Sequence, residues 1–187
     1  MRRRQLSLLV VALLLGLTSC SGDETEPGLA ERQGVADAVD IDAIRDGLAS
    51  LYAGDHAEQA DSQEGGCFAT ELLVRLSVPD LVEAGIVTDQ GLVVATVPPL
   101  DQETATSWVD AQFACSDYVE ASTRALLAQS KGKLRQETYA TCLRAALTDQ
   151  QLRAAIATTL TGDFEGPEVA ALATAQSTCA KSALPRD

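Results

Sequence analysis

The sequence predicts an all-α fold: a helical bundle built from two related three-helix units, each containing a pair of cysteines. Three observations support this prediction. After residue 40, apolar residues recur at intervals of three and four along most of the chain, which is typical of the buried face of an amphipathic helix. Several of these segments begin at good helix-capping residues, and the order of features in the first half recurs in the second. Residues 41–187 therefore form one predicted domain, long enough to bury a core.

The first three helices are predicted between residues 41 and 84. The first begins at residue 41 and ends at the polar stretch 54–66. Helices over residues 67–76 and 78–84 follow, and the second of these opens with a capping box formed by Ser77 and Asp80. The apolar residues that predict the first helix are Ile41, Ile44, Leu48, Leu51 and Tyr52.

Residues 86–97 are the one stretch rich in β-branched residues. Residues 89–91, with the sequence Asp-Gln-Gly, interrupt this stretch and are typical of a turn, so the pattern favours a small β-hairpin. Pro98 and Pro99 end it, because proline cannot donate a backbone hydrogen bond.

The remaining helices are predicted from Asp101 onward. Asp101 can cap a long helix that runs to about Gln129, where the sequence Lys-Gly-Lys of residues 131–133 signals its end. Thr148 and Gln151 form a second capping box. Three more helices complete the domain, over residues 134–146, 149–160 and 167–181.

Each half of the domain contains a cysteine helix, a capped helix and a third helix that ends in the pattern Ala-Gln-x-x-Cys. In the third helix of each half, apolar residues stand at the same positions relative to the cysteine, with the three-and-four spacing of a buried helix face. The matching residues are Ala105, Trp108, Ala111 and Cys115 in the first half and Val169, Leu172, Ala175 and Cys179 in the second.

The repeat also predicts how the cysteines pair. Apart from Cys20 the chain has four cysteines, and an even number in an oxidising compartment is typical of a disulfide framework. If each unit closes its own bridge, Cys67 pairs with Cys115 and Cys142 pairs with Cys179. This is one of three connectivities that four cysteines allow.

The first 40 residues have a different character. Three arginines at residues 2–4 precede an apolar run over residues 6–17. This run is shorter than the roughly 20 residues that a membrane-spanning helix needs, so it predicts a signal peptide over residues 1–19. Residues 20–40 are rich in Gly, Asp, Glu and Pro and predict a flexible tether between Cys20 and the domain.

The chain is strongly acidic, with a formal net charge of −13. The charge becomes more negative still if the signal peptide is removed, because residues 1–19 contain basic side chains and no acidic ones. An acidic domain repels nucleic acid, anionic phospholipid headgroups and anionic wall polymers. We therefore expect no nucleic-acid partner.

Residues suited to catalysis or to metal binding are scarce. His56 is the only histidine and lies in a polar segment, and the chain contains no nucleophile motif such as G-x-S-x-G, no phosphate-binding loop and no CxxC pair. Asp37, Asp40 and Asp42 lie close in sequence but lack the glycine and the terminal glutamate of an EF-hand loop. The sequence therefore predicts no catalytic residue, no cofactor and no metal site.

Two aromatic residues are expected to pack inside the domain. Trp108 and Tyr118 fall on the same predicted buried stripe as Cys115, in the long helix that begins after Asp101. At such positions packing is the more frequent role of an aromatic side chain than ligand stacking.

The chain resembles the uncharacterised small lipoproteins of high-GC Gram-positive bacteria, the actinobacteria. The segments that carry this resemblance are LTSC at residues 17–20, LYAGDHAEQA before Cys67, CFATELLV, AQFACSDYVE and AQSTCAK. One of these segments, LTSC, resembles the bacterial lipobox, which implies that the thiol of Cys20 is alkylated by diacylglycerol and that cleavage then leaves Cys20 as the first residue of the mature protein. The resemblance also implies a location on the outer face of the cytoplasmic membrane, and it brings no activity or binding residue with it.

These patterns favour a non-enzymatic binding or interaction lipoprotein of the cell envelope. Its expected partners are the membrane, through the lipid on Cys20, and an envelope protein or a small ligand. The alternatives are an envelope hydrolase that uses carboxylates and a small-ligand carrier with a cavity between its helices. Two convergent carboxylates with shifted pKa values in a deep pocket would favour the hydrolase, and a large apolar cavity would favour the carrier. An exposed apolar patch on a closed bundle would favour the interaction protein.

Overall fold

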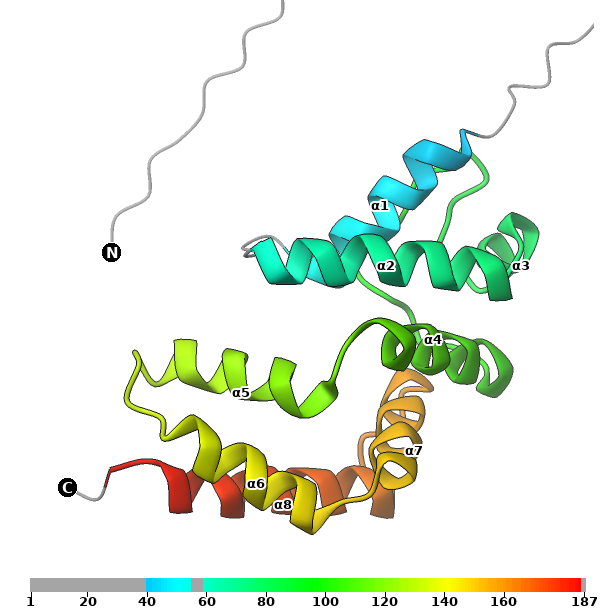
Figure 1. The fold of residues 1–187 in the computed structure, drawn as a ribbon. Helices are drawn as coiled ribbons and strands as arrows, with labels where there is room; N and C mark the ends of the chain where they lie inside the picture. Colours follow the sequence, from blue (N-terminus) through cyan, green and yellow to red (C-terminus); the bar gives the residue numbers. More distant parts are fainter. Residues whose placement is uncertain (1–39, 55–58, 186–187) are drawn as a thin grey trace, which may run out of the picture. The chain divides into compact units, whose positions relative to one another are not determined.

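The computed structural model describes residues 40–54 and 59–185, and all regular secondary structure in these residues is helical (Figure 1). The predicted all-α class is confirmed. The predicted signal peptide, Cys20, most of the tether and His56 lie outside the described residues. The helices are α1 (Ile41–Ala53), α2 (Gln59–Arg75), α3 (Val78–Glu83), α4 (Gln102–Cys115), α5 (Tyr118–Gln129), α6 (Gln136–Ala146), α7 (Asp149–Leu160) and α8 (Pro167–Ala183).

Two disulfides join the helices in the pairs that the repeat predicts. Cys67 of α2 is bonded to Cys115 at the end of α4, and Cys142 of α6 is bonded to Cys179 of α8. The Cα atoms are 5.6 Å apart in both bridges. Each bridge therefore ties the first helix of a three-helix unit to the third.

The repeat includes one more helix in each half than the sequence indicated. Ile44 of α1 and Val119 of α5 are separated by the same number of residues as Cys67 and Cys142, so they occupy corresponding positions in the two repeats. The side chains of Ile44 and Val119 are both buried. The same helix pairs also pack together: α1 on α2 and α2 on α4 in the first half, α5 on α6 and α6 on α8 in the second. Each repeat is thus a four-helix unit, in which α1 corresponds to α5.

Both predicted capping boxes are present. The Ser77 hydroxyl accepts a hydrogen bond from the Asp80 amide, and the Asp80 carboxylate accepts one from the Ser77 amide. Thr148 and Gln151 make the same reciprocal pair at the start of α7. Because these bonds satisfy amides that a helix leaves unpaired at its N-terminus, they fix where α3 and α7 begin.

The prediction of one long helix from Asp101 to Gln129 is wrong. The chain leaves the helical conformation at Ser116, which has φ −143° and ψ 146° and separates α4 from α5. The Asp117 carboxylate then accepts hydrogen bonds from the amides of Val119 and Glu120, at 2.8 and 3.1 Å. Ser and Asp offer the backbone such alternatives to helical hydrogen bonds, so they favour a break and a new N-cap at this point.

The predicted β-hairpin over residues 86–97 is reduced to a single antiparallel bridge between Val87 and Val93, and the described residues contain no strand. Its turn forms as expected, with the Gly91 amide donating to the Thr88 carbonyl at 2.8 Å. Ile86 and Val87 are adjacent and are both buried in the core. Successive side chains of a strand point to opposite faces, so the burial of both residues differs from a surface hairpin that packs on the core by one face only.

Helix α2 begins at Gln59, so the polar stretch 54–66 contains its first two turns as well as the predicted interruption. The polar side chains there have a role in packing, since Glu64 accepts a hydrogen bond from Arg124 of α5 at 2.8 Å. Gly65 is buried against α1. The first two turns of α2, which have few apolar residues, are therefore held by a close glycine contact and by an ion pair with the second repeat.

The two neighbouring glycines of α2 give opposite predictions for substitution by alanine. A Cβ atom on Gly65 would lie 2.6 Å from the carbonyl oxygen of Ala49, whereas one on Gly66 would meet no atom within 4 Å. We expect Gly66→Ala to stabilise the protein by up to about 1 kcal/mol, the difference in helix propensity. Gly65→Ala should destabilise it by about 1 to 3 kcal/mol, because α1 must move. Urea unfolding of both variants measures this difference, and shifts of the same sign would contradict the α1–α2 contact.

The buried residues form two clusters, one in each repeat. The first is built from α1 to α4 and the chain that follows α3, and the second from α5 to α8. Helix α7 contributes to both, because Leu152 and Ala155 belong to the second cluster and Ala157 to the first. Phe113 of α4 packs against both clusters. The repeats are thus joined along α7 and at the end of α4.

Candidate functional site

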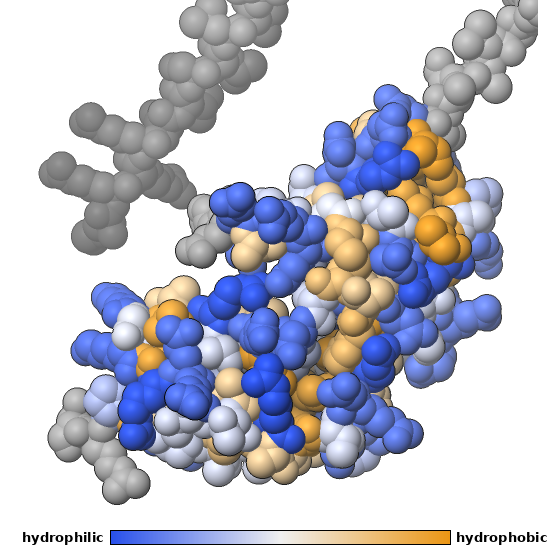
Figure 2. Space-filling model, viewed as in Figure 1, coloured by the Kyte–Doolittle hydropathy of each residue, from blue (hydrophilic) through white to orange (hydrophobic). Residues whose placement is uncertain are grey.

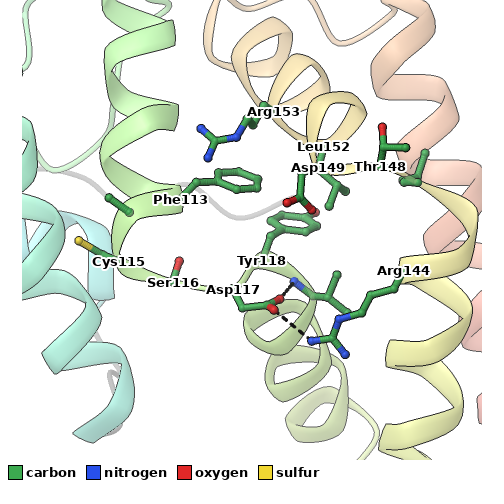
Figure 3. Close-up of a pocket in the computed structure, with 13 residues that line it drawn as sticks. Phe113, Cys115, Ser116, Asp117, Tyr118, Arg144, Thr148, Asp149, Leu152 and Arg153 are labelled. Atoms are coloured by element: carbon green, nitrogen blue, oxygen red, sulfur yellow. Dashed lines mark hydrogen bonds and ion pairs between the residues drawn. The ribbon is translucent and has the colours of Figure 1, made fainter.

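A groove with a volume of about 650 Å³ lies where the two repeats meet (Figure 3). We call it the inter-repeat groove. It is bounded by the end of α4, the start of α5, the end of α6 and the first turns of α7. Its floor is formed by Phe113, Tyr118, Val119, Leu147 and Leu152, and its rim includes Asp117, Arg144, Asp149 and Arg153.

The floor of the groove is apolar and is fixed by the cores beneath it. Val119, Leu147 and Leu152 are buried members of the second cluster. Figure 3 shows Phe113 from α4 and Tyr118 from α5 pointing into the space beside α7. The Tyr118 hydroxyl accepts a hydrogen bond from the side-chain amide of Gln176 at 2.9 Å, which ties its ring to α8. The groove therefore combines a small apolar floor, presented mainly by Phe113 and Tyr118, with a larger polar lining.

Two arginines stand on the rim, and each is paired with an aspartate. Arg144 donates to Asp117 at 3.0 Å, and Arg153 donates to Asp110 at 2.7 Å. The Arg153 guanidinium also lies 4.2 Å from the centre of the Phe113 ring, a cation–π arrangement. All four charged side chains are between 39% and 51% exposed. Ion pairs with this exposure contribute at most about 1 kcal/mol, so the arginines can exchange partners at little cost.

The electrostatics of Asp117 favour its charged form. Burial raises the pKa of the Asp117 carboxyl, but the hydrogen bonds from the Glu120 amide and from the Arg144 guanidinium outweigh this effect. The pKa of Asp117 is therefore lower than that of an ordinary aspartate. A carboxylic acid that donates a proton in hydrolysis needs a raised pKa instead. Asp117 is suited to orienting Arg144 and capping α5.

The aspartates considered for calcium have helix-terminal roles where they are described. Asp40 caps α1 by accepting hydrogen bonds from the amides of Asp42 and Ala43, at 3.0 and 3.1 Å. Asp42 pairs with Arg45 in the first turn of the same helix. Asp37 lies outside the described residues. In residues 40–54 and 59–185, no group of three or more His, Cys, Asp or Glu side chains is arranged to hold a metal ion.

The two aromatic residues assigned to one buried stripe have different positions. Trp108 is buried in the first cluster, where its ring lies 4.7 Å from that of Phe68, so its packing role is confirmed. Tyr118 does not share a helix with Cys115, because the break at Ser116 places it in the first turn of α5. There it packs against the second cluster, as its predicted packing role requires, and also lines the inter-repeat groove.

The sequence reasoning missed Phe113, Arg144 and Arg153 as members of a site. The sequence did contain one usable signal. Phe113 in the first copy of the Ala-Gln-x-x-Cys pattern corresponds to Ser177 in the second copy. A large aromatic residue at a position that is polar in the other repeat marks a local difference in environment. The arginines gave no comparable signal, because only the fold brings α4, α6 and α7 together.

None of the helices in the described part of the chain combines the length and the apolar character needed to cross a membrane. Comparison of the chain with protein-family models, with curated proteins and with solved structures finds no match.

Proposed function

We propose that this protein is a non-enzymatic binding lipoprotein of the cell envelope, held on the outer face of the cytoplasmic membrane by a lipid on Cys20. The inter-repeat groove is its binding site. The observation that supports this proposal best is the combination of an apolar floor with two half-exposed arginines in a chain whose net charge is −13.

The chemistry of the groove indicates the kind of partner. The floor can accept an apolar or aromatic side chain, and the rim presents Arg144 and Arg153 together with Asp117 and Asp149. A protein segment that carries both an apolar residue and charges of either sign complements this arrangement. Arg144 and Arg153 are held by pairs weak enough to be replaced by a carboxylate of the partner.

The two alternatives predict other features. A carrier needs a large enclosed apolar cavity, whereas the inter-repeat groove has a charged rim. A carboxylate hydrolase needs a carboxyl group with a raised pKa to donate a proton, and the lowered pKa of Asp117 does not suit that role. The first comparison argues against a carrier, and the second argues against Asp117 as the proton donor of a hydrolase at this groove.

A photocrosslinking residue at Asp149, on the groove rim, tests the proposal in the lipid-anchored protein in its own membrane. We expect a discrete adduct at this position. The matched control is the same residue at Glu137, an exposed acidic residue in the first turn of α6, outside the groove. Replacing Arg144 and Arg153 together with alanine should reduce the Asp149 adduct at least tenfold, since removal of two charged contacts costs more than the 1.4 kcal/mol that corresponds to this factor.

Equal adducts at Asp149 and Glu137, or an Asp149 adduct that survives loss of both arginines, would contradict binding at the groove. Turnover of peptidoglycan, glycoside, ester or peptide substrates by the mature protein, abolished when one acidic residue is replaced without unfolding, would favour the hydrolase instead.

A further inference from the structure

We propose that the end of the domain nearest the tether rests on the phospholipid bilayer through an apolar face formed by Ile41, Leu73, Val74 and Val78. We call this surface the tether-proximal face. The inference rests on the proposed lipid anchor at Cys20 and assigns a second, non-covalent contact with the same membrane.

The side chains of this face are unusually exposed for their type. Val74 is 77% exposed and Ile41 is 44% exposed, and both are among the large apolar residues that the described part of the chain leaves open to solvent. Leu73 and Val78 are partly buried beside them and pack against the first cluster. The four residues line one shallow groove between α1, α2 and the start of α3. Figure 2 shows apolar surface around the start of α1, which in this view continues along the chain between α3 and α4.

The charged residues beside this face comprise two ion pairs and two further acidic side chains, Asp40 directly before Ile41 and Asp80 in the first turn of α3. Arg45 pairs with Asp42, and Arg75 pairs with Glu71, so that each basic residue at the edge has an acidic partner in its own helix. The chain as a whole carries a net charge of −13 and is repelled by anionic headgroups. The face can therefore approach a bilayer of zwitterionic headgroups more readily than an anionic one. The long arginine side chains can also extend toward the headgroups while their carbon chains cover apolar surface.

The position of the tether selects the bilayer as the occupant. The chain from Cys20 enters the domain at Asp40, directly before Ile41. A connection of this length can span at most about 70 Å when fully extended. Attachment at this point raises the effective concentration of the bilayer at the tether-proximal face above that at more distant surfaces. A weak apolar contact that would not bind free protein can therefore form in the anchored protein.

The experiment compares two single-tryptophan additions in full-length, lipidated protein reconstituted into phosphatidylcholine vesicles. One is Val74→Trp on the tether-proximal face, and the matched control is Phe164→Trp, which replaces a side chain that is 69% exposed in the α7–α8 connection. The native Trp108 is buried and gives the common background. Tryptophan itself favours membrane interfaces, and the control carries the same preference.

With brominated phosphatidylcholine in the vesicles, we expect the emission of Val74→Trp to be quenched several-fold more than that of Phe164→Trp, and to shift to shorter wavelength. Vesicle flotation of both variants reports the lipid anchor separately. Failure to float would contradict the proposed function, whereas flotation with equal quenching of the two variants would overturn the bilayer contact alone. A blue shift of Val74→Trp without quenching, together with crosslinked dimers, would assign the face to a second copy of this chain and also overturn it.

Discussion

Replacing Cys142 and Cys179 with alanine is expected to lower the free energy of unfolding by about 3 to 4.5 kcal/mol, because the bridge closes a loop of 37 residues in the unfolded chain. The Cys67–Cys115 pair closes a loop of 48 residues, and chain entropy alone gives it nearly the same value. The variant without the Cys142–Cys179 bridge should nevertheless lose more stability than the variant without the Cys67–Cys115 bridge. Cys179 is buried in the second cluster, so its sulfur also fills space in the core.

Urea unfolding of the two double-alanine variants, made in an oxidising compartment, measures this difference. The unfolding slope should be checked for each variant, because loss of one bridge can separate the unfolding of the two clusters. Non-reducing peptide mapping of the wild type supplies the control for connectivity. A larger loss for the Cys67–Cys115 variant, or crossed pairing in the wild type, would contradict this account.

The fold was predictable where the signals are local. The capping boxes at Ser77 and Thr148 fixed two helix starts, because the bonds that form them span only three residues. The disulfide pairing could be predicted without knowledge of the local geometry, because the same sequence pattern recurs around the cysteines of each repeat. Repetition in sequence thus substituted for knowledge of distances.

The errors arose where burial outweighs local pattern. Residues 59–66 contain almost no apolar residue, and their helix depends on the fit of Gly65 against α1 and on Arg124 from the other repeat. The correspondence of α1 with α5 was also hidden. Leu48 matches Thr123, which is buried but polar, so the apolar periodicity of α5 is weaker than that of α1.

The inter-repeat groove could not be predicted from one repeat or the other. Its floor and rim come from four helices and from the break at Ser116, which the apolar pattern of residues 102–129 does not reveal. Sequence reasoning identified the aromatic residue Tyr118 but assigned it to the wrong helix face, since the assignment assumed an unbroken helix. A two-residue interruption was enough to move this side chain from the stripe of α4 to the inter-repeat groove.

The second large effect is expected at Cys20. Replacing this residue with alanine should abolish lipid attachment and the cleavage that depends on it, because no thiol remains to receive the diacylglycerol. Each acyl CH₂ buried in a bilayer contributes about 0.8 kcal/mol, and two chains give stable anchoring where one gives marginal binding. The expected result is complete loss of label when cells are grown with a fatty-acid analogue.

The matched control for this prediction is Ser21→Ala, which leaves the thiol in place and should keep both the label and the new N-terminus at Cys20. Labelling and N-terminal sequencing must be read together, because an uncleaved precursor keeps the apolar run over residues 6–17 and can remain with the membrane fraction without a lipid. Membrane fractionation alone is therefore insufficient. Label that persists in Cys20→Ala, or a wild-type N-terminus at another residue, would remove the basis for the envelope location and with it the expected contact of the tether-proximal face with the bilayer.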